Sequence, residues 1–219
     1  MTDTAFLRVH DLVVATGLRV PDFELDNALT LLCTGREASA TTTMLTLAGR
    51  MKPVKGSIEL DLPDGSTLDS PRALNKHIAL AGVSSIDGLD RNVRVATYIR
   101  EVSAWSSPWY RRTPTDITNI ERWQSIRDLF ELEIEPRAQV GSLNPTHRFV
   151  LRVALALLAR PEPALVVIDD IDQVRSLDIR AELIDHLRTL SERTPVIVAS
   201  TNSDTHQQFD RVISLTQGE

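Results

Sequence analysis

The chain has 219 residues, of which 42% are hydrophobic and 25% charged, a balance that suits one compact α/β domain or a domain with a small insert. A net charge of −6 without a basic stripe argues against a general nucleic-acid-binding protein. The single cysteine, Cys33, excludes a disulfide within the chain. Its place in an apolar run predicts a buried, inert thiol, which fits a reducing cytoplasm.

Neither a secretory signal nor a membrane span is predicted. The first residues lack a basic segment followed by a long apolar core. The most apolar stretch, residues 149–168, is broken by Arg152, Arg160 and two prolines, so it does not qualify as a membrane span. We therefore expect any membrane role to go through a partner.

Apolar runs and helical periodicity predict an alternating α/β chain. The predicted strands are 6–9, 28–33, 57–60, 77–82, 164–169, 196–200 and 211–215, and the predicted helices are 42–51, 95–105, 117–132, 146–159 and 177–192. The early strands, joined by turns such as Pro63-Asp64-Gly65, favour an antiparallel layer, and the late alternation favours a parallel sheet covered by helices. No convincing strand lies between residues 81 and 143. We expect one domain over residues 1–219 with a helical insert at about 84–144.

Residues 31–51 have the strand–loop–helix context of a phosphate-binding loop but lack its chemistry. When the pattern G-x-x-x-x-G-K-[ST] is placed on Gly35, Ala40 takes the second glycine, Thr41 the lysine and Thr42 the hydroxyl position. The candidate nucleotide-binding residues of this degenerate loop are Gly35, Ser39, Ala40, Thr41, Thr42 and Thr43.

The missing lysine should weaken triphosphate binding. Thr41 can donate one neutral hydrogen bond, where an ammonium group would donate three charged ones. A charge-assisted bond contributes roughly 1.5–3 kcal/mol against about 1 kcal/mol for a neutral one, and a left-handed Ala40 would cost about 1–2 kcal/mol more. The expected loss of affinity is roughly two to three orders of magnitude. The alternative is an ordinary strand-to-helix turn.

Later segments resemble the ATP-binding domain of ATP-binding-cassette (ABC) transporters. Residues 150–170, VLRVALALLARPEPALVVIDD, resemble the helix and Walker B strand of that family, and residues 47–58, 176–178, 194–202 and 210–218 resemble other pieces in the expected order. The match spans roughly residues 6–218. It implies an α/β fold: a P-loop NTPase core of the ABC type with a parallel sheet, an antiparallel β layer and a helical subdomain. It also implies that Asp169 ends the strand neighbouring the phosphate loop.

The resemblance assigns roles to further positions, and nearly all depart from the family. Asp169 keeps the Walker B position and would hold Mg²⁺ together with Thr42 if nucleotide binds. Asp170 replaces the catalytic glutamate, and Asn202 replaces the switch histidine. The signature segment reads Leu143, Asn144, Pro145, Thr146, His147, without its glycines. No adenine-stacking ring occurs at residues 13–16, and the glutamine position falls near Val83 or Ser84.

Together these losses predict a degenerate nucleotide-binding domain, with ATP and Mg²⁺ bound weakly or not at all. Residues 168–172, IDDID, and 83–89, VSSIDGL, resemble the actinobacterial cassettes that accompany membrane proteins of the YhgE/Pip type. The resemblance implies a membrane permease as partner, pairing with a second identical or different cassette, and a cytoplasmic location at the inner face of the cell membrane. Two alternatives stay open: a slow but genuine ABC ATPase that drives transport, and a soluble regulatory pseudo-ATPase.

All tryptophans and tyrosines fall between residues 98 and 123. Aromatic residues and arginines dominate interface hot spots, so the proline-flanked segment Trp109, Tyr110, Arg111, Arg112 is the predicted docking surface for the permease. Tyr98, Trp105 and Trp123 lie on helical patterns, and we expect them in the core of the insert.

Overall fold

Two sheets organise the protein, whose computed structural model describes residues 6–26, 28–35, 39–110 and 112–215. An antiparallel sheet has the order β2-β1-β4-β5, built from β1 (Phe6–Val13), β2 (Phe23–Leu25), β4 (Lys55–Asp61) and β5 (Thr67–Leu68). A parallel sheet has the order β6-β7-β8-β3-β9, built from β3 (Leu29–Cys33), β6 (Ile78–Ala81), β7 (Leu165–Ile168), β8 (Val196–Ser200) and β9 (Arg211–Ser214). Every residue of β6, β7 and β8 is buried, as expected for parallel strands covered on both faces.

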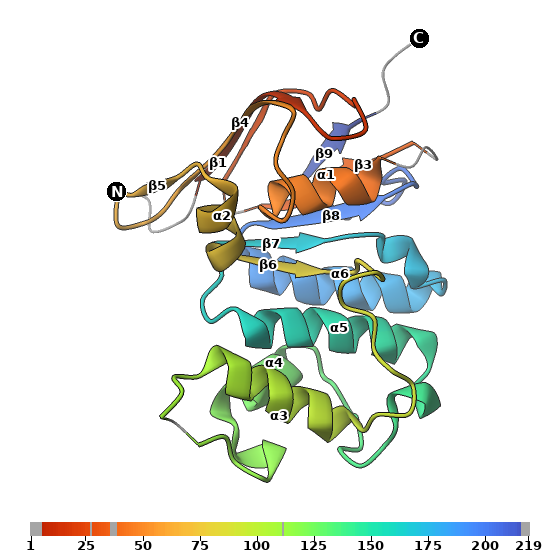
Figure 1. Cartoon of the computed structure of the whole chain (residues 1–219). Coiled ribbons are helices and arrows are strands. Elements are labelled where there is room, and N and C mark those ends of the chain that lie inside the picture. The colour runs from red at the N-terminus through yellow and green to blue at the C-terminus, as the bar shows by residue number, and fades with distance from the viewer. Residues whose placement is uncertain (1–5, 27, 36–38, 111, 216–219) are drawn as a thin grey trace.

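Helices cover both faces of the parallel sheet (Figure 1). The helix α1 (Ala40–Leu47) lies between the two sheets, and α5 (Pro145–Ala159) and α6 (Leu177–Ser191) cover the opposite face. Below α5 lie α3 (Val95–Ser106) and α4 (Glu121–Leu129), with the short 3-10 turns η1 (Ile117–Asn119) and η2 (Val140–Ser142). The remaining elements are α2 (Pro71–His77) and the turn η3 (Ile171–Gln173).

Two apolar clusters hold these layers together. One lies between the sheets and around α1, with Leu7, Met44 and Ile197 among its members. The other joins the far face of the parallel sheet to α5, α6 and the insert, with Phe149 and Trp123 among its members. Because β7 and β8 contribute side chains to both clusters, the carboxyl ends of the parallel strands are held firmly between them.

The seven predicted strands and five predicted helical regions all correspond to observed elements. The structure adds β2, β5 and α2, extends β1 to Val13, and divides the helix expected at 117–132 into η1 and α4. One topological expectation is wrong: Asp169 follows β7, which does not neighbour β3, because β8 lies between them.

Candidate functional site

The phosphate-loop segment and Asp169 meet through a side-chain hydrogen bond. The Thr41 hydroxyl, at the lysine position, donates to Asp169 Oδ2 at 2.6 Å, across 128 residues of sequence. The helix begins at Ala40, two residues before the expected start, and Ala40 does not have a positive φ, so the expected left-handed strain is absent. Residues 36–38 lie outside the described part of the chain.

Ser39, at the start of α1, is held by hydrogen bonds from two threonine hydroxyls. Ser39 is its N-cap residue, but no side chain caps the helix. The Thr16 hydroxyl donates to Ser39 Oγ at 3.0 Å, and the Thr43 hydroxyl donates to the Ser39 carbonyl at 2.9 Å. Thr16 lies in the segment where the family would place its stacking ring, and a hydroxyl there contacts the loop instead.

Asp169 is buried and only partly satisfied. Its side chain is 2% exposed, and Oδ1 has no hydrogen-bond partner among the described residues. Burial raises the pKa of Asp169. The Thr41 hydrogen bond opposes that shift, and the charges of Asp170 and Asp87 add to it. The carboxyl group is therefore held in an environment that favours its neutral form.

Asp170, at the glutamate position, adopts a left-handed backbone conformation with φ 49°. Burial raises its pKa, and the charge of Asp172 raises it further, whereas Gln173, Arg152 and Arg180 lower it. A non-glycine residue in this conformation carries backbone strain of about 1–2 kcal/mol, although aspartate tolerates it better than most.

The main polar centre of the site is Asp172, to which the sequence interpretation assigned no role. Its carboxylate accepts hydrogen bonds from the Ser200 and Thr201 hydroxyls, the Thr201 N–H and Asn202 Nδ2, at 2.8–3.0 Å. Arg180 of α6 completes the set with an ion pair at 2.9 Å. Burial opposes ionisation of Asp172, but the donors from Asn202, Thr201 and Ser200 outweigh it and lower the pKa.

Asn202, at the switch-histidine position, is thus engaged by Asp172 rather than by Asp170. Its backbone carbonyl lies 3.8 Å from the thiol of Cys33 at the end of β3. Cys33 is half-buried, whereas a buried thiol was expected. Burial, with a smaller contribution from Asp172, raises the pKa of this thiol and keeps it protonated.

The signature-like segment starts α5 and uses its donors internally. Asn144 caps the helix by accepting the His147 N–H at 2.7 Å, and Pro145, at the first helical position, has no N–H to offer. The Leu143 N–H donates to the Val140 carbonyl, and Thr146 is buried. The N–H groups of Leu143 and His147 are therefore engaged within the protein, and Pro145 has none.

At the glutamine position, Val83 is buried, and a carboxylate four residues later takes part instead. Asp87 Oδ2 accepts the Gly82 N–H at 2.7 Å, and Asp87 Oδ1 pairs with Arg152 of α5. Gln173 closes the network by accepting from Arg152 at 2.8 Å and donating to the Gly82 carbonyl at 3.0 Å. The β6 end, α5 and η3 are therefore linked by one hydrogen-bonded network.

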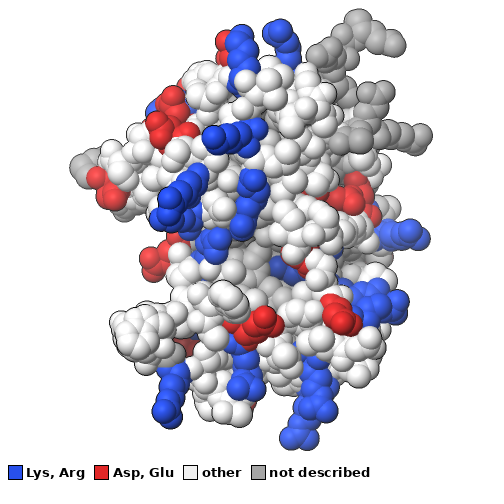
Figure 2. All heavy atoms as spheres, in the orientation of Figure 1, with Lys and Arg blue, Asp and Glu red and all other residues white. Residues whose placement is uncertain are grey.

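Several charged groups of this site are already engaged within the protein. The two arginines that influence them, Arg152 and Arg180, are already paired with Asp87 and Asp172. Among the described residues, no group of three or more His, Cys, Asp or Glu is placed to hold a metal ion. On the face in Figure 2, several basic side chains gather over the upper middle, and acidic and basic side chains are mixed elsewhere. Among the described residues, the unpartnered Oδ1 of Asp169 is a feature that suits a cation.

The aromatic residues of the insert divide differently from the expectation. Trp123 is buried, as predicted, and Tyr98 packs against the same cluster. Trp105 is 83% exposed, so its predicted core position is wrong. Trp109 is 96% and Tyr110 is 73% exposed, and their rings meet edge to face at 6.0 Å. Arg112 is exposed, and Arg111 lies outside the described residues.

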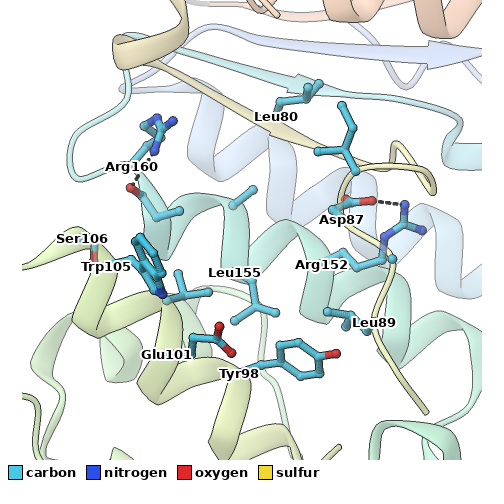
Figure 3. A pocket seen from close by; sticks show the side chains of 15 residues that line it. Leu80, Asp87, Leu89, Tyr98, Glu101, Trp105, Ser106, Arg152, Leu155 and Arg160 are labelled. Carbon is cyan, nitrogen blue, oxygen red and sulfur yellow. Dashed lines mark hydrogen bonds and ion pairs between the residues drawn. The ribbon is translucent and has the colours of Figure 1, made fainter.

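A groove of about 370 Å³ lies between α3, α5 and the segment after β6. In Figure 3, Trp105 stands at one end near Arg160, and Asp87 and Arg152 lie at the other, with Leu155 between them. Most of the remaining lining is apolar, including Ile86, which is 54% exposed. Trp105 is thus an exposed aromatic residue of this groove.

Comparison with known proteins defines the class of fold. No protein-family model and no curated protein sequence matches the chain. Solved structures do match. An ABC transporter ATP-binding protein from Pyrococcus furiosus has a TM-score of 0.68 and 20% identity over 96% of this chain and 97% of its own. The cassette cbiO1 from Clostridium perfringens, part of the transporter complex cbiONQ, has a TM-score of 0.70 and 17% identity over 95% and 83%.

A bacterial Atm1-family ABC exporter with ATP bound also matches, with a TM-score of 0.70 and 13% identity. That match covers 99% of this chain but only 38% of the exporter chain. The chain therefore has the fold of the ATP-binding cassettes of ABC transporters, and the predicted fold class is confirmed. No helix among the described residues is long and apolar enough to cross a membrane.

Proposed function

We propose that this chain is an ATP-binding-cassette subunit of a membrane transport complex that has lost most of its nucleotide chemistry. It binds ATP and Mg²⁺ weakly or not at all, and hydrolysis by the chain alone is negligible. Residues 1–219 form one cassette domain, with the helical insert at about 84–144. The protein works in the cytoplasm, peripheral to the inner face of the cell membrane.

The hydrogen bond between Thr41 and Asp169 is the observation that carries this proposal. It puts a neutral hydroxyl where a lysine would neutralise the outer phosphates, and it occupies one oxygen of the carboxylate that would orient the magnesium shell. Asn202 is likewise engaged by Asp172. Thr41, one oxygen of Asp169 and Asn202 are therefore each engaged within the protein itself.

The exposed aromatics support docking on a permease. Trp105 is exposed and lines the groove between α3 and α5, and Trp109 and Tyr110, which follow it in the chain, are exposed as well. Exposed aromatic residues flanked by arginine are typical of interface hot spots. The likeness of residues 168–172 to cassettes that accompany YhgE/Pip-type proteins favours a permease of that kind.

Pairing with a second cassette, identical or different, is the other partnership we propose. The face would include the segment around Gly35 and Thr41–Thr43, the signature-like segment, and Asp178 at the start of α6. A similar solved structure, the bacterial ABC transporter cassette MJ0796, is dimeric and has 14% identity and a TM-score of 0.69, and cbiO1 is part of a transporter complex. A retained architecture without its chemistry is most simply explained by retained surfaces.

A slow ATPase is the second candidate function, and one observation favours it. Asp169 Oδ1 is buried without a partner, so a cation bound through ATP could satisfy it. Thr42 would then supply the hydroxyl beside it. The two candidates differ in a measurable way, because a slow ATPase must bind ATP with Mg²⁺ before it can turn it over.

Calorimetric titration of the purified chain with ATP, with and without Mg²⁺, separates these candidates. We expect no tight binding and no phosphate release above background. The double change Ala40→Gly and Thr41→Lys should raise affinity by about tenfold or more, since it restores a cation, but should not restore turnover, because Asp170 and Asn202 remain. Micromolar binding by the unmodified chain would reject the proposal in favour of the slow ATPase.

Membrane association tests the docking surface. The triple change Trp109→Ala, Arg111→Glu and Arg112→Glu should abolish sedimentation with native membranes while leaving the thermal unfolding temperature nearly unchanged. The exposed Val54, on the loop before β4, offers a matched control as Val54→Ala. If the triple variant stays folded and still sediments with membranes, the docking surface lies elsewhere.

A further inference from the structure

The turn after β8 is held by an unusually dense set of contacts to a single carboxylate. Four hydrogen-bond donors on three consecutive residues, Ser200, Thr201 and Asn202, converge on Asp172. These residues lie 28–30 positions away from Asp172 in the sequence, and the pairing of β7 with β8 brings them close together. The contacts therefore tie the η3 turn to the end of β8.

Asp172 is built to stay ionised at the centre of this set. The ion pair with Arg180 is largely buried, with side-chain exposures of 15% and 16%, and Arg180 also donates to the Val174 carbonyl at 2.7 Å and 2.9 Å. The other ionisable groups that act on or respond to Asp172 are Asp170 and the Cys33 thiol, and its charge raises the pKa of both. Neither offers a positive charge, so Arg180 and the donors of the turn stabilise the carboxylate.

The arrangement resembles the binding of an anionic ligand by a loop. Backbone N–H, hydroxyl and amide donors gathered on a short turn commonly hold a bound anion. Here the anion is a side chain of the same molecule, and it engages Asn202, the residue at the switch-histidine position. Charge-assisted bonds of this kind contribute roughly twice as much as neutral ones, so the turn has a strong internal reason to keep one conformation.

We propose that Asp172 is a built-in anionic ligand that fixes the turn Ser200–Asn202 in one conformation, independently of nucleotide. The inference rests on the proposed function in one respect. It takes the chain to be a cassette, and in a cassette the residue at the Asn202 position is expected to contact bound ATP. Regulation of this cassette by nucleotide is then lost at the turn as well as at the phosphate loop. A partner that binds this turn therefore contacts the same surface with or without ATP.

Hydrogen exchange at the Thr201 amide tests the contact directly, because that N–H donates to Asp172 Oδ2 at 2.8 Å. In Asp172→Asn, protection of Thr201 and its neighbours should fall about tenfold or more, since the charge-assisted bonds are lost. The exposed Asp185→Asn, farther along α6, is the matched control and should leave protection unchanged. Adding ATP with Mg²⁺ to the unmodified chain should change nothing at this turn.

Cys33, the single cysteine, provides a second readout. Its rate of modification by a thiol reagent at mildly alkaline pH should rise in Asp172→Asn, because both the contact at Asn202 and the carboxylate that raises the thiol pKa are disturbed. If Asp172→Asn does not fold, Asn202→Ala removes one donor only and should give the same changes at smaller size.

Binding of ATP in the same samples keeps the two proposals distinguishable. If ATP binds tightly and protection at Thr201 stays constant, the proposed weak binding fails and this inference stands. If ATP does not bind and both Asp172→Asn and Asn202→Ala leave protection unchanged, the inference is wrong and the proposed function stands. A change of protection on adding ATP to the unmodified chain overturns the inference.

Discussion

Replacing Arg152 by methionine should destabilise the fold more than any surface change. Arg152 is 9% exposed on α5, pairs with Asp87, donates to Gln173 at 2.8 Å and lies 5.8 Å from the Phe149 ring. Methionine keeps the apolar stem but removes the charge. Asp87, itself only 20% exposed, would be left without its counter-ion beside the Gly82 N–H.

The expected cost follows from breaking a buried ion pair. Removing one partner typically costs about 3–5 kcal/mol, and we take the lower end, about 3 kcal/mol, because Asp87 retains some contact with water. A chain of this size loses roughly 2–4 °C of melting temperature per kcal/mol, so the expected shift is about 6–12 °C. Urea unfolding followed by circular dichroism, together with a thermal melt, measures both quantities.

The double variant Arg152→Met with Asp87→Asn separates charge from packing. Because no unpaired charge remains, it should recover about 1 kcal/mol or more of the loss, as neutral replacements of buried pairs often do. A single variant that loses less than about 1 kcal/mol, or a double variant no more stable than the single one, would refute the assignment of Arg152 to a structural ion pair.

Three further predictions concern stability. Asp169 has a raised pKa in the folded state, so its ionisation destabilises the fold as pH rises through that pKa. Asp169→Asn should therefore be more stable than the unmodified chain at pH 7. Denaturant titrations at falling pH should show the difference in stability between the two proteins shrinking. Gly82→Ala should destabilise strongly, because φ is +90° and an added Cβ would lie 2.0 Å from the Asp169 carbonyl oxygen; equal melting temperatures would contradict this. Trp123→Ala should cost about 3–5 kcal/mol and Trp109→Ala close to nothing, measured by parallel urea titrations, because the first side chain is buried and the second exposed.

The parallel sheet could be predicted from the sequence because each of its strands is a run of mostly apolar residues. The run Val196–Ser200 matches β8 at both ends, and β3 and β7 differ from their predicted runs by at most one residue at an end. Both faces of these strands are buried, so nearly every position must be apolar. The antiparallel layer gave a weaker signal, and β2 and β5, with three and two residues, are too short to show a pattern.

Helix α2 was missed although its signal was present. Ser70 caps it by accepting the Ala73 N–H, and Pro71 takes the first helical position, a common start for a helix. Trp105 was misplaced for a different reason. The buried stripe of α3 runs through Val95, Ile99 and Ser103, and at about 100° per residue Trp105 lies about 80° outside that stripe, on the exposed side of the helix.

The candidate site could be predicted only in part. The resemblance to ABC cassettes predicts that the phosphate-loop segment lies close to Asp169. The structure places the side chains of Thr41 and Asp169 in contact. The role of Asp172 could not be read from the chain, because its partners come from the turn after β8. Its sequence signal is a third aspartate after an apolar strand, which equally suits a solvated strand end.

The placement of the three tryptophans gives the insert its own optical signal. All three tryptophans lie within residues 105–123, so tryptophan fluorescence reports on the insert and not on the two sheets. Trp123 is buried, whereas Trp105 and Trp109 are largely in water. Unfolding should therefore shift the emission of Trp123 to longer wavelength, and a partner that covers the aromatic surface should shift the other two to shorter wavelength. The direction of the spectral shift alone would distinguish a docked cassette from a damaged one.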